Sequence, residues 1–357
     1  MSSVLERASA APYSLSHQEM VELLSLDDAT ELFAAAYQVK LRHIGKRVSL
    51  RGLIELGNTC AKDCLYCGIR KSNAEVTRYR LLADDVIRMA QWAFDHDYGS
   101  LVLQSGELEG EENTLYIEGI LSRLHELFGD QLGITLCLGE QTEEVYRRWF
   151  DAGAHRYLLR METSSPELYA QLHPPDHCFD RRKACIQVLK RLGYQTGSGV
   201  MIGLPGQTTD DLARDIMFFR EMDLDMIGMG PYLPHHQTPL GKDVECSKTF
   251  EAQQLHLALN MIAVTRLYLH DVNIASTTAL QALADNGREQ GLLAGANVLM
   301  PNVTDTEYRR HYQLYENKPC MDENSTQCRS CLNSRVLSIG EEMNWGVRGD
   351  SPHYQTR

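Results

Sequence analysis

Features that direct a chain to a membrane, to secretion or to nucleic acid are absent from these 357 residues. No apolar stretch runs uninterrupted for the roughly 18 residues that a transmembrane helix needs, so we expect no membrane partner. The first residues, MSSVLERASAAPYSLSHQEM, lack a basic start followed by an apolar run, so no secretory signal is expected. The formal net charge of −13 lacks the basic excess typical of nucleic-acid binding, so no nucleic-acid partner is expected either.

Cysteine is too sparse for a disulfide scaffold. The ten cysteines make up about 3% of the chain, far below the density of small secreted domains. We therefore expect a cytoplasmic protein, because in reducing surroundings clustered cysteines bind metal more often than they form disulfides. The hydrophobic content of 43% suffices for one large core or two ordinary domains.

Short apolar runs alternate with longer segments of helical spacing, such as ADDVIRMAQWAFDHD and TDDLARDIMFFREMD. Alternation of this kind over about 250 residues is typical of a parallel (β/α)8 TIM barrel, although an open doubly wound sheet has the same periodicity. We expect an α/β protein with a barrel at 48–305, an N-terminal helical extension at 1–47 and a C-terminal cluster-binding tail at 306–357. The eight expected strands are 48–56, 100–106, 133–139, 155–162, 196–203, 224–230, 271–277 and 296–302.

Polar or glycine-rich clusters follow seven of these strands: NTC, QSGE, LGEQ, RMET, GLPGQ, GPYLPHH and STT. In a TIM barrel the carboxyl ends of the strands converge on one face, where the active site lies. The cysteine-bearing loop after the first strand is therefore expected to open onto the same cavity as the other clusters.

That loop, CAKDCLYCG, places Cys60, Cys64 and Cys67 within eight residues. Structural zinc sites usually take four ligands as two separated pairs, a pattern that this spacing does not follow. Thiolates also suit iron–sulfur clusters, which have four cysteine ligands in ferredoxins. Three thiolates leave one iron of a four-iron cluster open, and an open iron is a binding site.

A CxxxCxxC loop with an aromatic residue before the third cysteine resembles the radical S-adenosylmethionine (SAM) superfamily. In that superfamily the open iron of a [4Fe-4S] cluster binds SAM, and an electron from the reduced cluster cleaves SAM to a 5′-deoxyadenosyl radical. QSGE, GVMIGLPGQ and RME resemble three further motifs of the superfamily. The resemblance implies an enzyme that binds a [4Fe-4S] cluster and SAM and takes electrons from a donor.

Longer stretches are similar to the HydE family, radical SAM maturases of [FeFe]-hydrogenase that are related to biotin synthase. The resemblance implies a role in assembly of the hydrogenase diiron centre, on a small organometallic iron–cysteine substrate, with the scaffold HydF and the maturase HydG as partners. The stretches that carry it are CLYCGIRKSN, LVLQSGE, AGAHRYLLRMETSSP, GYQTGSGVMIGLPGQT, MGPYLPHHQTPL, IASTTA and GANVLMPNVTDTEYRRHYQLYENKPC.

The resemblance also implies roles for individual residues. The positions that match the ligands of the SAM-binding cluster are Cys60, Cys64 and Cys67. Those that match SAM contacts are Tyr66, Glu107, Arg160, Glu162, Arg182 and Met300. Those that match the substrate end of the cavity are Arg156, Thr277, Thr278 and Tyr312, and a guanidinium and hydroxyls suit an anionic, amino-acid-like ligand. A possible second iron–sulfur cluster is implied at Cys320, Cys328 and Cys331.

Other interpretations of these residues stay open. One alternative is an amino-acid mutase similar to the methylornithine synthase PylB, whose barrel resembles this chain but lacks the C-terminal cysteine trio. Another is a non-catalytic iron–sulfur scaffold that holds a cluster in the same three-cysteine loop. The charged SAM-contact residues also suit a structural ion-pair network, and the trio also suits zinc. Met161 stands where the family commonly has histidine, so substrate or mechanism differs if this position faces the cavity. His235 and His236 are adjacent in a loop, where both side chains seldom coordinate one metal, so packing or substrate contact is expected instead.

Overall fold

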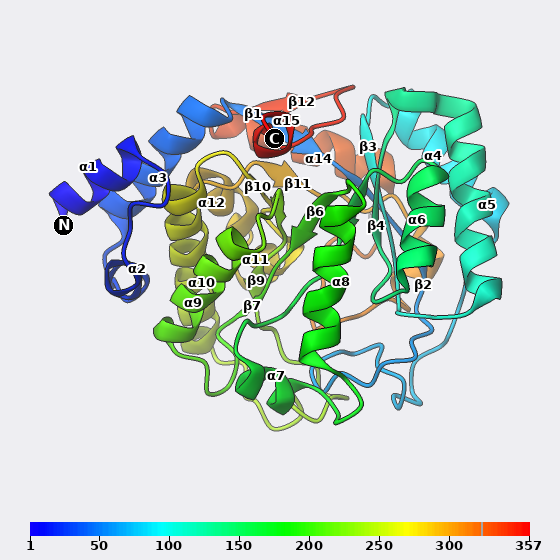
Figure 1. Ribbon diagram of the computed structural model, residues 1–357, viewed down its shortest axis with the longest axis horizontal. Helices are drawn as coiled ribbons and strands as arrows, with labels where there is room; N and C mark the ends of the chain where they lie inside the picture. The colour runs from blue at the N-terminus through cyan, green and yellow to red at the C-terminus, as the bar shows by residue number, and fades with distance from the viewer. Residues whose placement is uncertain (323) are drawn as a thin grey trace.

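Strands and helices alternate along the chain in the computed structural model, which describes residues 1–322 and 324–357 (Figure 1). The strands are β1 (Arg47–Leu50), β2 (Gly52–Gly57), β3 (Ser100–Ser105), β4 (Gly133–Cys137), β5 (Arg156–Leu158), β6 (Gln195–Ser198), β7 (Met201–Ile202), β8 (Met226–Ile227), β9 (Gly230–Pro231), β10 (Asn273–Ile274), β11 (Val298–Leu299) and β12 (Glu342–Asn344). The helices are α1 (Ser2–Ala10), α2 (His17–Leu24), α3 (Thr30–His43), α4 (Ala83–Asp95), α5 (Glu111–Phe128), the short 3-10 helix η1 (Gly129–Gln131), α6 (Glu143–Asp151), α7 (Pro166–Leu172), α8 (Phe179–Arg191), α9 (Thr209–Glu221), α10 (Lys248–Leu269), α11 (Thr278–Leu283), α12 (Gly287–Leu293), α13 (Thr306–Arg309), α14 (Ser325–Ser338) and α15 (Pro352–Gln355).

Parallel pairing joins the strands into an α/β fold, as the sequence predicts. The larger sheet has the order β10-β8-β6-β5-β4-β3-β2, and every neighbouring pair in it is parallel. A second parallel sheet has the order β11-β1-β12. Single parallel bridges join Leu53 of β2 to Asn302, and Ala275, directly after β10, to Val298 of β11. The two sheets are therefore in contact at both edge strands of the larger one.

Several expected strands are shorter than predicted. The ladder is interrupted within 196–203, which forms β6 and β7, and within 224–230, which forms β8 and part of β9. A Cβ atom on Gly199 would lie 2.1 Å from the carbonyl oxygen of Gly228, so the two backbones approach more closely than a side chain permits. Of the expected strand 155–162, regular pairing covers Arg156–Leu158, and a single bridge joins Glu162 to Val200.

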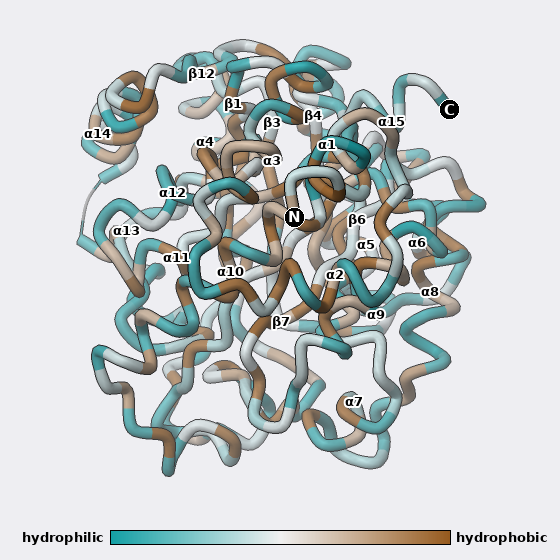
Figure 2. The backbone as a smooth tube through the Cα atoms, turned by 90° about the vertical axis from the view of Figure 1, so that its left-hand side faces the viewer, coloured by the Kyte–Doolittle hydropathy of each residue, from teal (hydrophilic) through white to brown (hydrophobic). Residues whose placement is uncertain are grey.

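The flanking helix α4 buries one face, whereas α10 is buried all round from Ala258 to Leu269. In α4 the buried positions follow the spacing of a single helical face and are Val86, Met89, Ala90 and Ala93. The N-terminal helices α1, α2 and α3 pack against α10. Figure 2 shows hydrophobic backbone through the middle of the molecule, around α10 and β7, and largely hydrophilic backbone along α6 and α8. Within the described residues, no helix combines the length and the apolar character that crossing a bilayer requires.

The last residues of the C-terminal segment, 341–357, pack on the end of the molecule opposite to the cysteine loop, whereas its earlier part contacts that loop through the Gly68 N–H, which donates to the Leu314 carbonyl oxygen at 3.0 Å. In Figure 1 the loop after β2 and α7 lie at the bottom, whereas β12, α15 and the C-terminus lie at the top. β12 pairs with β1, and Glu341 forms a fully buried ion pair with Lys40 of α3 at 2.6 Å. The carboxyl ends of the strands and residues 341–357 thus lie at opposite ends of one packed body.

Candidate functional site

The loop after β2 carries Cys60, Cys64 and Cys67 as free, partly buried thiols. A tight turn brings the second and third together, because the Cys67 N–H donates to the Cys64 carbonyl oxygen at 3.2 Å. Burial raises the pKa of Cys64 to about 12, and burial together with negative charge on Cys64 and Cys60 raises the pKa of Cys67. Thiols that repel one another once ionised favour a bound metal, which takes them as thiolates. The loop therefore fits a metal centre.

The QSGE segment after β3 packs directly on this loop. A Cβ atom on Gly106 would lie 2.3 Å from the carbonyl oxygen of Thr59, so only glycine permits the approach. The Glu107 N–H donates to Cys60 Sγ at 3.3 Å, and the Ala61 N–H donates to the Glu107 carbonyl oxygen at 2.8 Å. Glu107 is thereby fixed beside the first cysteine.

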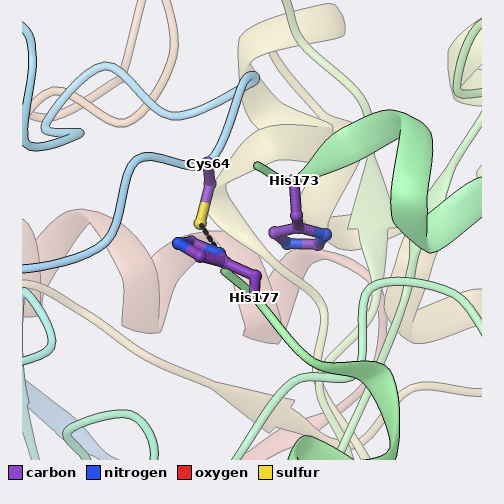
Figure 3. A group of neighbouring side chains, drawn as sticks. All are labelled: Cys64, His173 and His177. Atoms are coloured by element: carbon purple, nitrogen blue, oxygen red, sulfur yellow. Dashed lines mark hydrogen bonds between the residues drawn. The ribbon is translucent and has the colours of Figure 1, made fainter. Parts of the chain in front are cut away.

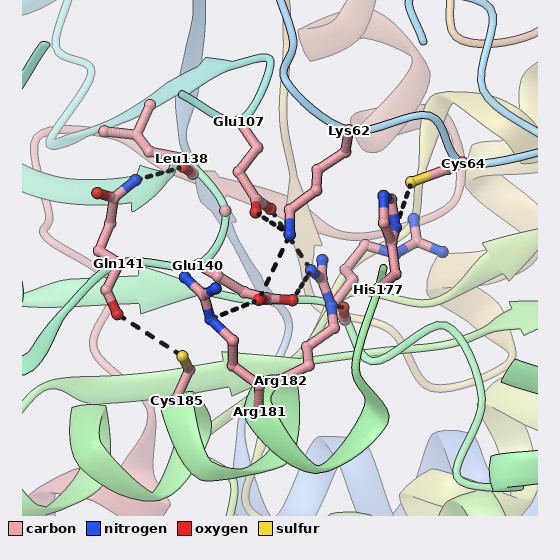
Figure 4. A network of polar contacts seen from close by, with 12 residues as sticks. Lys62, Cys64, Glu107, Leu138, Glu140, Gln141, His177, Arg181, Arg182 and Cys185 are labelled. Atoms are coloured by element: carbon pink, nitrogen blue, oxygen red, sulfur yellow. Dashed lines mark hydrogen bonds and ion pairs between the residues drawn. The ribbon is translucent and has the colours of Figure 1, made fainter. Parts of the chain in front are cut away.

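The side chain of Glu107 belongs to a network of opposite charges (Figure 4). Lys62 Nζ lies 3.3 Å from Glu107 Oε1 and 3.7 Å from Glu140 Oε2. The Arg182 guanidinium lies 3.5 Å from Glu107 Oε2 and donates to Glu140 Oε1 at 2.9 Å. Burial raises the pKa of Glu107, and the positive charges of Arg182 and Lys62 oppose that rise. The neighbour of Glu107 Oε1 is the Lys62 ammonium at 3.3 Å, an ion pair that a ligand ammonium can replace.

Arg160 and Glu162 follow β5 and form an ion pair at 2.9 Å. The Arg160 guanidinium donates to the Val200 carbonyl oxygen at 3.0 Å, and the Arg160 carbonyl oxygen accepts from Arg182 Nε at 2.6 Å. Glu162 has a backbone φ of +68°, a conformation that non-glycine residues adopt at a cost. The structure therefore brings together the four charged residues that the sequence singles out, Glu107, Arg160, Glu162 and Arg182. It adds Lys62 and Glu140 to them.

Met161 lies in the main hydrophobic core and is fully buried. It shares this core with Leu159 and Tyr157. Although β5 ends at Leu158, the N–H groups of Leu159 and Met161 both donate to the neighbouring segment at 3.0 Å, so these alternate residues face the same side. Position 161 therefore packs with the core beneath the flanking helices. Because position 161 does not face the cavity, methionine there does not change the residues that line it.

Two histidines that the sequence analysis did not single out lie beside the cysteine loop (Figure 3). His177 Nδ1 lies 3.9 Å from Cys64 Sγ, and His173 Nε2 lies 3.3 Å from the Tyr66 hydroxyl. Burial lowers the pKa of His173 to about 3, so its ring is neutral. The available signal was the HPPDH spacing, but these residues follow α7 and reach the cysteine loop only through the tertiary fold.

The residues expected at the substrate end come from other loops on the same face. Thr277 and Thr278 follow β10, and Thr278 exchanges a hydrogen bond of 3.0 Å with the Tyr315 hydroxyl. Thr277 Oγ1 is buried and has no hydrogen-bond partner among the described residues. The Tyr312 hydroxyl accepts from Gln104 Nε2 at 3.1 Å, beside the end of β3. Among the expected SAM contacts, Met300 follows β11 and is half-buried.

Arg156 is not brought to this group. It begins β5, at the amino ends of the strands, and its guanidinium donates to Ser100 Oγ at 2.7 Å and to the Arg348 carbonyl oxygen at 2.6 Å. It also forms an ion pair with Asp350 and is fully buried. These contacts replace the expected substrate-binding role with a structural one.

The C-terminal cysteine trio is brought together around a space of about 30 Å³. Cys320, Cys328 and Cys331 line it with Arg288 and Arg335, and Arg288 donates to Cys320 Sγ at 3.5 Å. A hydrogen bond with Cys320, together with burial, raises the pKa of Cys328. Three thiols and two guanidiniums around one space fit an anionic metal–thiolate centre.

Comparison with known proteins identifies the family. The model of the radical SAM superfamily matches residues 54–219. The [FeFe] hydrogenase maturase subunit HydE of Thermotoga maritima is 41% identical over 333 residues, which are 92% of this chain and 92% of that protein. The 3-methylornithine synthase of Methanosarcina acetivorans is 26% identical over 294 residues, which are 80% of this chain and 79% of that protein.

Two solved structures share the fold. The methylornithine synthase PylB superposes with a TM-score of 0.79 at 22% identity, covering 96% of this chain and 98% of its own. The [FeFe]-hydrogenase maturase HydG from Carboxydothermus hydrogenoformans also gives 0.79, at 21% identity, covering 96% of this chain and 79% of its own. These identities show the fold alone, whereas the similarity to HydE extends over nearly the whole chain. The protein is thus a member of the radical SAM superfamily and, within it, of the HydE family.

Proposed function

We propose that this radical SAM enzyme acts in the assembly of the diiron centre of [FeFe]-hydrogenase. The observation that carries the proposal is a loop with three free thiols, joined by hydrogen bonds to Glu107, in a chain 41% identical to a hydrogenase maturase subunit. The reaction that we assign to the protein is reductive cleavage of SAM, with the product radical acting on an organometallic iron–cysteine substrate.

The scaffold for this reaction is a closed (β/α)8 barrel at 48–305. Closure is supported by the parallel pairing of β1 with β11 and by two single bridges, from Ala275 to Val298 of β11 and from Leu53 to Asn302 just beyond β11. Residues 1–47 form a helical extension and residues 306–357 a C-terminal extension. A closed barrel confines a radical and excludes water from it.

The cysteine loop would hold the [4Fe-4S] cluster through Cys60, Cys64 and Cys67. When bound, the cluster and SAM together supply the 5′-deoxyadenosyl radical. Glu107 would bind the SAM ammonium, which would replace the Lys62 ammonium that lies 3.3 Å from Glu107 Oε1.

The remaining SAM contacts surround this carboxylate. Arg160, Glu162 and Arg182 would hold the SAM carboxylate and ribose, and their mutual contacts fix their orientations before SAM binds. Tyr66 and Met300 would line the nucleoside pocket, with Tyr66 held by its hydrogen bond to His173.

The substrate end would be formed by Thr277, Thr278 and Tyr312. Thr277 offers a hydroxyl oxygen without a partner among the described residues, and Gln104 orients the hydroxyl of Tyr312. Hydroxyl groups suit the carboxylate or cyanide of an iron–cysteine complex. Arg156 is not part of this site, because its guanidinium is occupied at the other end of the strands.

The same proposal extends to a second cluster, to protein partners and to the location of the protein. The C-terminal trio would hold a second iron–sulfur cluster, since its three sulfurs and two guanidiniums enclose one space. HydG and the scaffold HydF would be partners, an electron donor would reduce the SAM-binding cluster, and the free thiols of the cysteine loop suit the reducing cytoplasm.

Turnover of SAM tests the chemistry. Protein reconstituted anaerobically with iron and sulfide, then reduced, should convert SAM to 5′-deoxyadenosine. Cys60→Ala should abolish the product, whereas Cys178→Ala, which removes an exposed thiol outside the loop, should leave it unchanged. Equal product from Cys60→Ala and the parent protein would contradict the cluster assignment.

Maturation of a hydrogenase tests the role. Co-expression with HydF, HydG and an [FeFe]-hydrogenase should yield active hydrogenase, and Cys60→Ala should yield none. The alternative is an amino-acid mutase, which the similarity to methylornithine synthases in sequence and fold favours. Formation of 3-methylornithine from lysine, with no hydrogenase activation, would decide for the mutase.

A further inference from the structure

A second group of metal-ligand side chains lies close to the cysteine loop and consists of His235, His236 and Glu316. One ligand atom from each residue lies within 4.8 Å of the others. His235 is 4% exposed, whereas the side chains of His236 and Glu316 are 67% and 35% exposed. The group is therefore anchored on one side and open to solvent on the other, and none of its members belongs to the site proposed above.

We propose that His235, His236 and Glu316 bind one divalent first-row transition ion. Two imidazoles and one carboxylate form a donor set used for iron and zinc, and they leave positions on the ion open. Adjacent side chains in a loop usually diverge, but these rings stack, with centroids 5.0 Å apart and planes inclined by 13°. Both Nδ1 atoms approach the same oxygen: His236 Nδ1 is hydrogen-bonded to Glu316 Oε1, and His235 Nδ1 lies 3.8 Å from it.

The ion takes the place of weaker contacts. Without it, one proton joins His236 Nδ1 to the Glu316 carboxylate, and the Gln237 N–H donates to His235 Nδ1 at 3.2 Å. When the ion binds His236 Nδ1, the ring proton moves through solvent from Nδ1 to Nε2, so the ion takes two neutral imidazoles and one carboxylate with no net loss of protons. The backbone N–H of Gln237 then loses His235 Nδ1 as its acceptor and donates to solvent instead.

The ion would join segments that frame the substrate end. His235 lies in the loop after β9, whereas Glu316 directly follows Tyr315, whose hydroxyl bonds Thr278. Gly68, next to the third cysteine, is packed between the two segments, since a Cβ atom there would lie 2.6 Å from the His235 ring and 2.2 Å from a carbonyl oxygen of the other segment. An ion at this position therefore fixes both segments against the cysteine loop. This site does not depend on the hydrogenase role.

Zinc provides the probe. Cluster-loaded protein is titrated anaerobically with Zn²⁺ by calorimetry, and the bound zinc is examined by X-ray absorption. We expect one equivalent with imidazole and oxygen ligands and no sulfur, because zinc at either cysteine site would show sulfur scattering. His236→Ala and Glu316→Gln should each weaken binding at least about tenfold. His17→Ala is the matched control, because His17 lies 3.3 Å from Asp210 in another surface His–carboxylate pair.

Amide hydrogen exchange tests whether the ion fixes the two segments against the cysteine loop. Zn²⁺ should slow amide exchange at 233–241 and 310–317 in the parent protein and in His17→Ala, but not in His236→Ala. His236 is largely exposed, so its removal does not threaten the fold, and an unchanged cluster spectrum verifies this. The proposal is overturned if the bound zinc has sulfur ligands only, if His236→Ala binds zinc as tightly as the parent, or if millimolar Zn²⁺ does not bind.

Discussion

Glu107→Gln removes one negative charge while keeping the shape of the side chain. The Glu107 side chain is 8% exposed, with Lys62 Nζ 3.3 Å from its Oε1 and Arg182 3.5 Å from its Oε2. A hydrogen bond to a charged group contributes about 1.5–3 kcal/mol and one to a neutral group about 0.5–1.5 kcal/mol, so an amide oxygen in place of the carboxylate should weaken SAM binding about tenfold. The cluster should still assemble, because its three cysteines are unchanged.

Glu140→Gln is the matched control for Glu107→Gln, because it also removes one buried negative charge from the same network. Glu140 is also buried and contacts the same Lys62 and Arg182, but Glu107 is the carboxylate whose backbone is bonded to the cysteine loop. Anaerobic calorimetry on the two cluster-loaded variants should show a much smaller loss of SAM affinity for Glu140→Gln. Parent-like affinity in Glu107→Gln would mean that the ammonium binds elsewhere. An equal loss in both variants would mean that only the charge balance of the network matters.

Other perturbations test the loop, the opposite end of the strands and the core. Gly106→Ala should prevent cluster assembly, seen as lost visible absorbance, because the new Cβ atom would lie 2.3 Å from the backbone of the cysteine loop, whereas Gly119→Ala, with open space around it, should assemble normally. Asp350→Ala should lower the free energy of unfolding in urea by about 3 kcal/mol and leave SAM affinity unchanged, since it strips the fully buried Arg156 of its charged partner. Burial raises the pKa of Asp215 to about 7, so the folded protein keeps a proton that the unfolded chain loses near about pH 4. Stability should therefore fall as the pH rises from about 4 to about 7, and Asp215→Asn should remove that fall in urea titrations at several pH values.

The placement of the cysteine loop could be predicted from sequence because it depends on regular structure. Parallel strands have their carboxyl ends on one face, so residues that follow different strands meet there whatever the loops do. That rule brought Cys60, Glu107 and Arg160 into one region, and the structure places them there. The same rule applied to the LGEQ segment. Its Glu140 was not among the predicted site residues, although Lys62 and Arg182 each contact both Glu140 and Glu107.

The rest depends on tertiary contacts that no local pattern encodes. Arg156 is two residues from the end of its strand in sequence, yet its partner Asp350 lies almost two hundred residues further along the chain. His177 approaches Cys64 from the non-helical segment after α7, and its HPPDH spacing does not reveal that the tertiary fold brings it to the cysteine loop. The interruption at Gly199 follows from the approach of a neighbouring backbone. In each case the decisive neighbour is distant in sequence.

The contacts around Glu107 explain how one short loop can prepare a site for a chelating ligand. Its N–H donates to Cys60 Sγ, its carbonyl oxygen accepts from Ala61, and its carboxylate pairs with Lys62 of the same loop. Backbone donor, backbone acceptor and side chain are thus all tied to three consecutive residues, so carboxylate and thiolate cannot move independently. A ligand that binds a metal on the sulfur and the carboxylate at once meets two partners already in place, and it gains affinity because little ordering is left to be done. Lys62 compensates the buried carboxylate of Glu107, and in the proposed complex a ligand ammonium would take over that role.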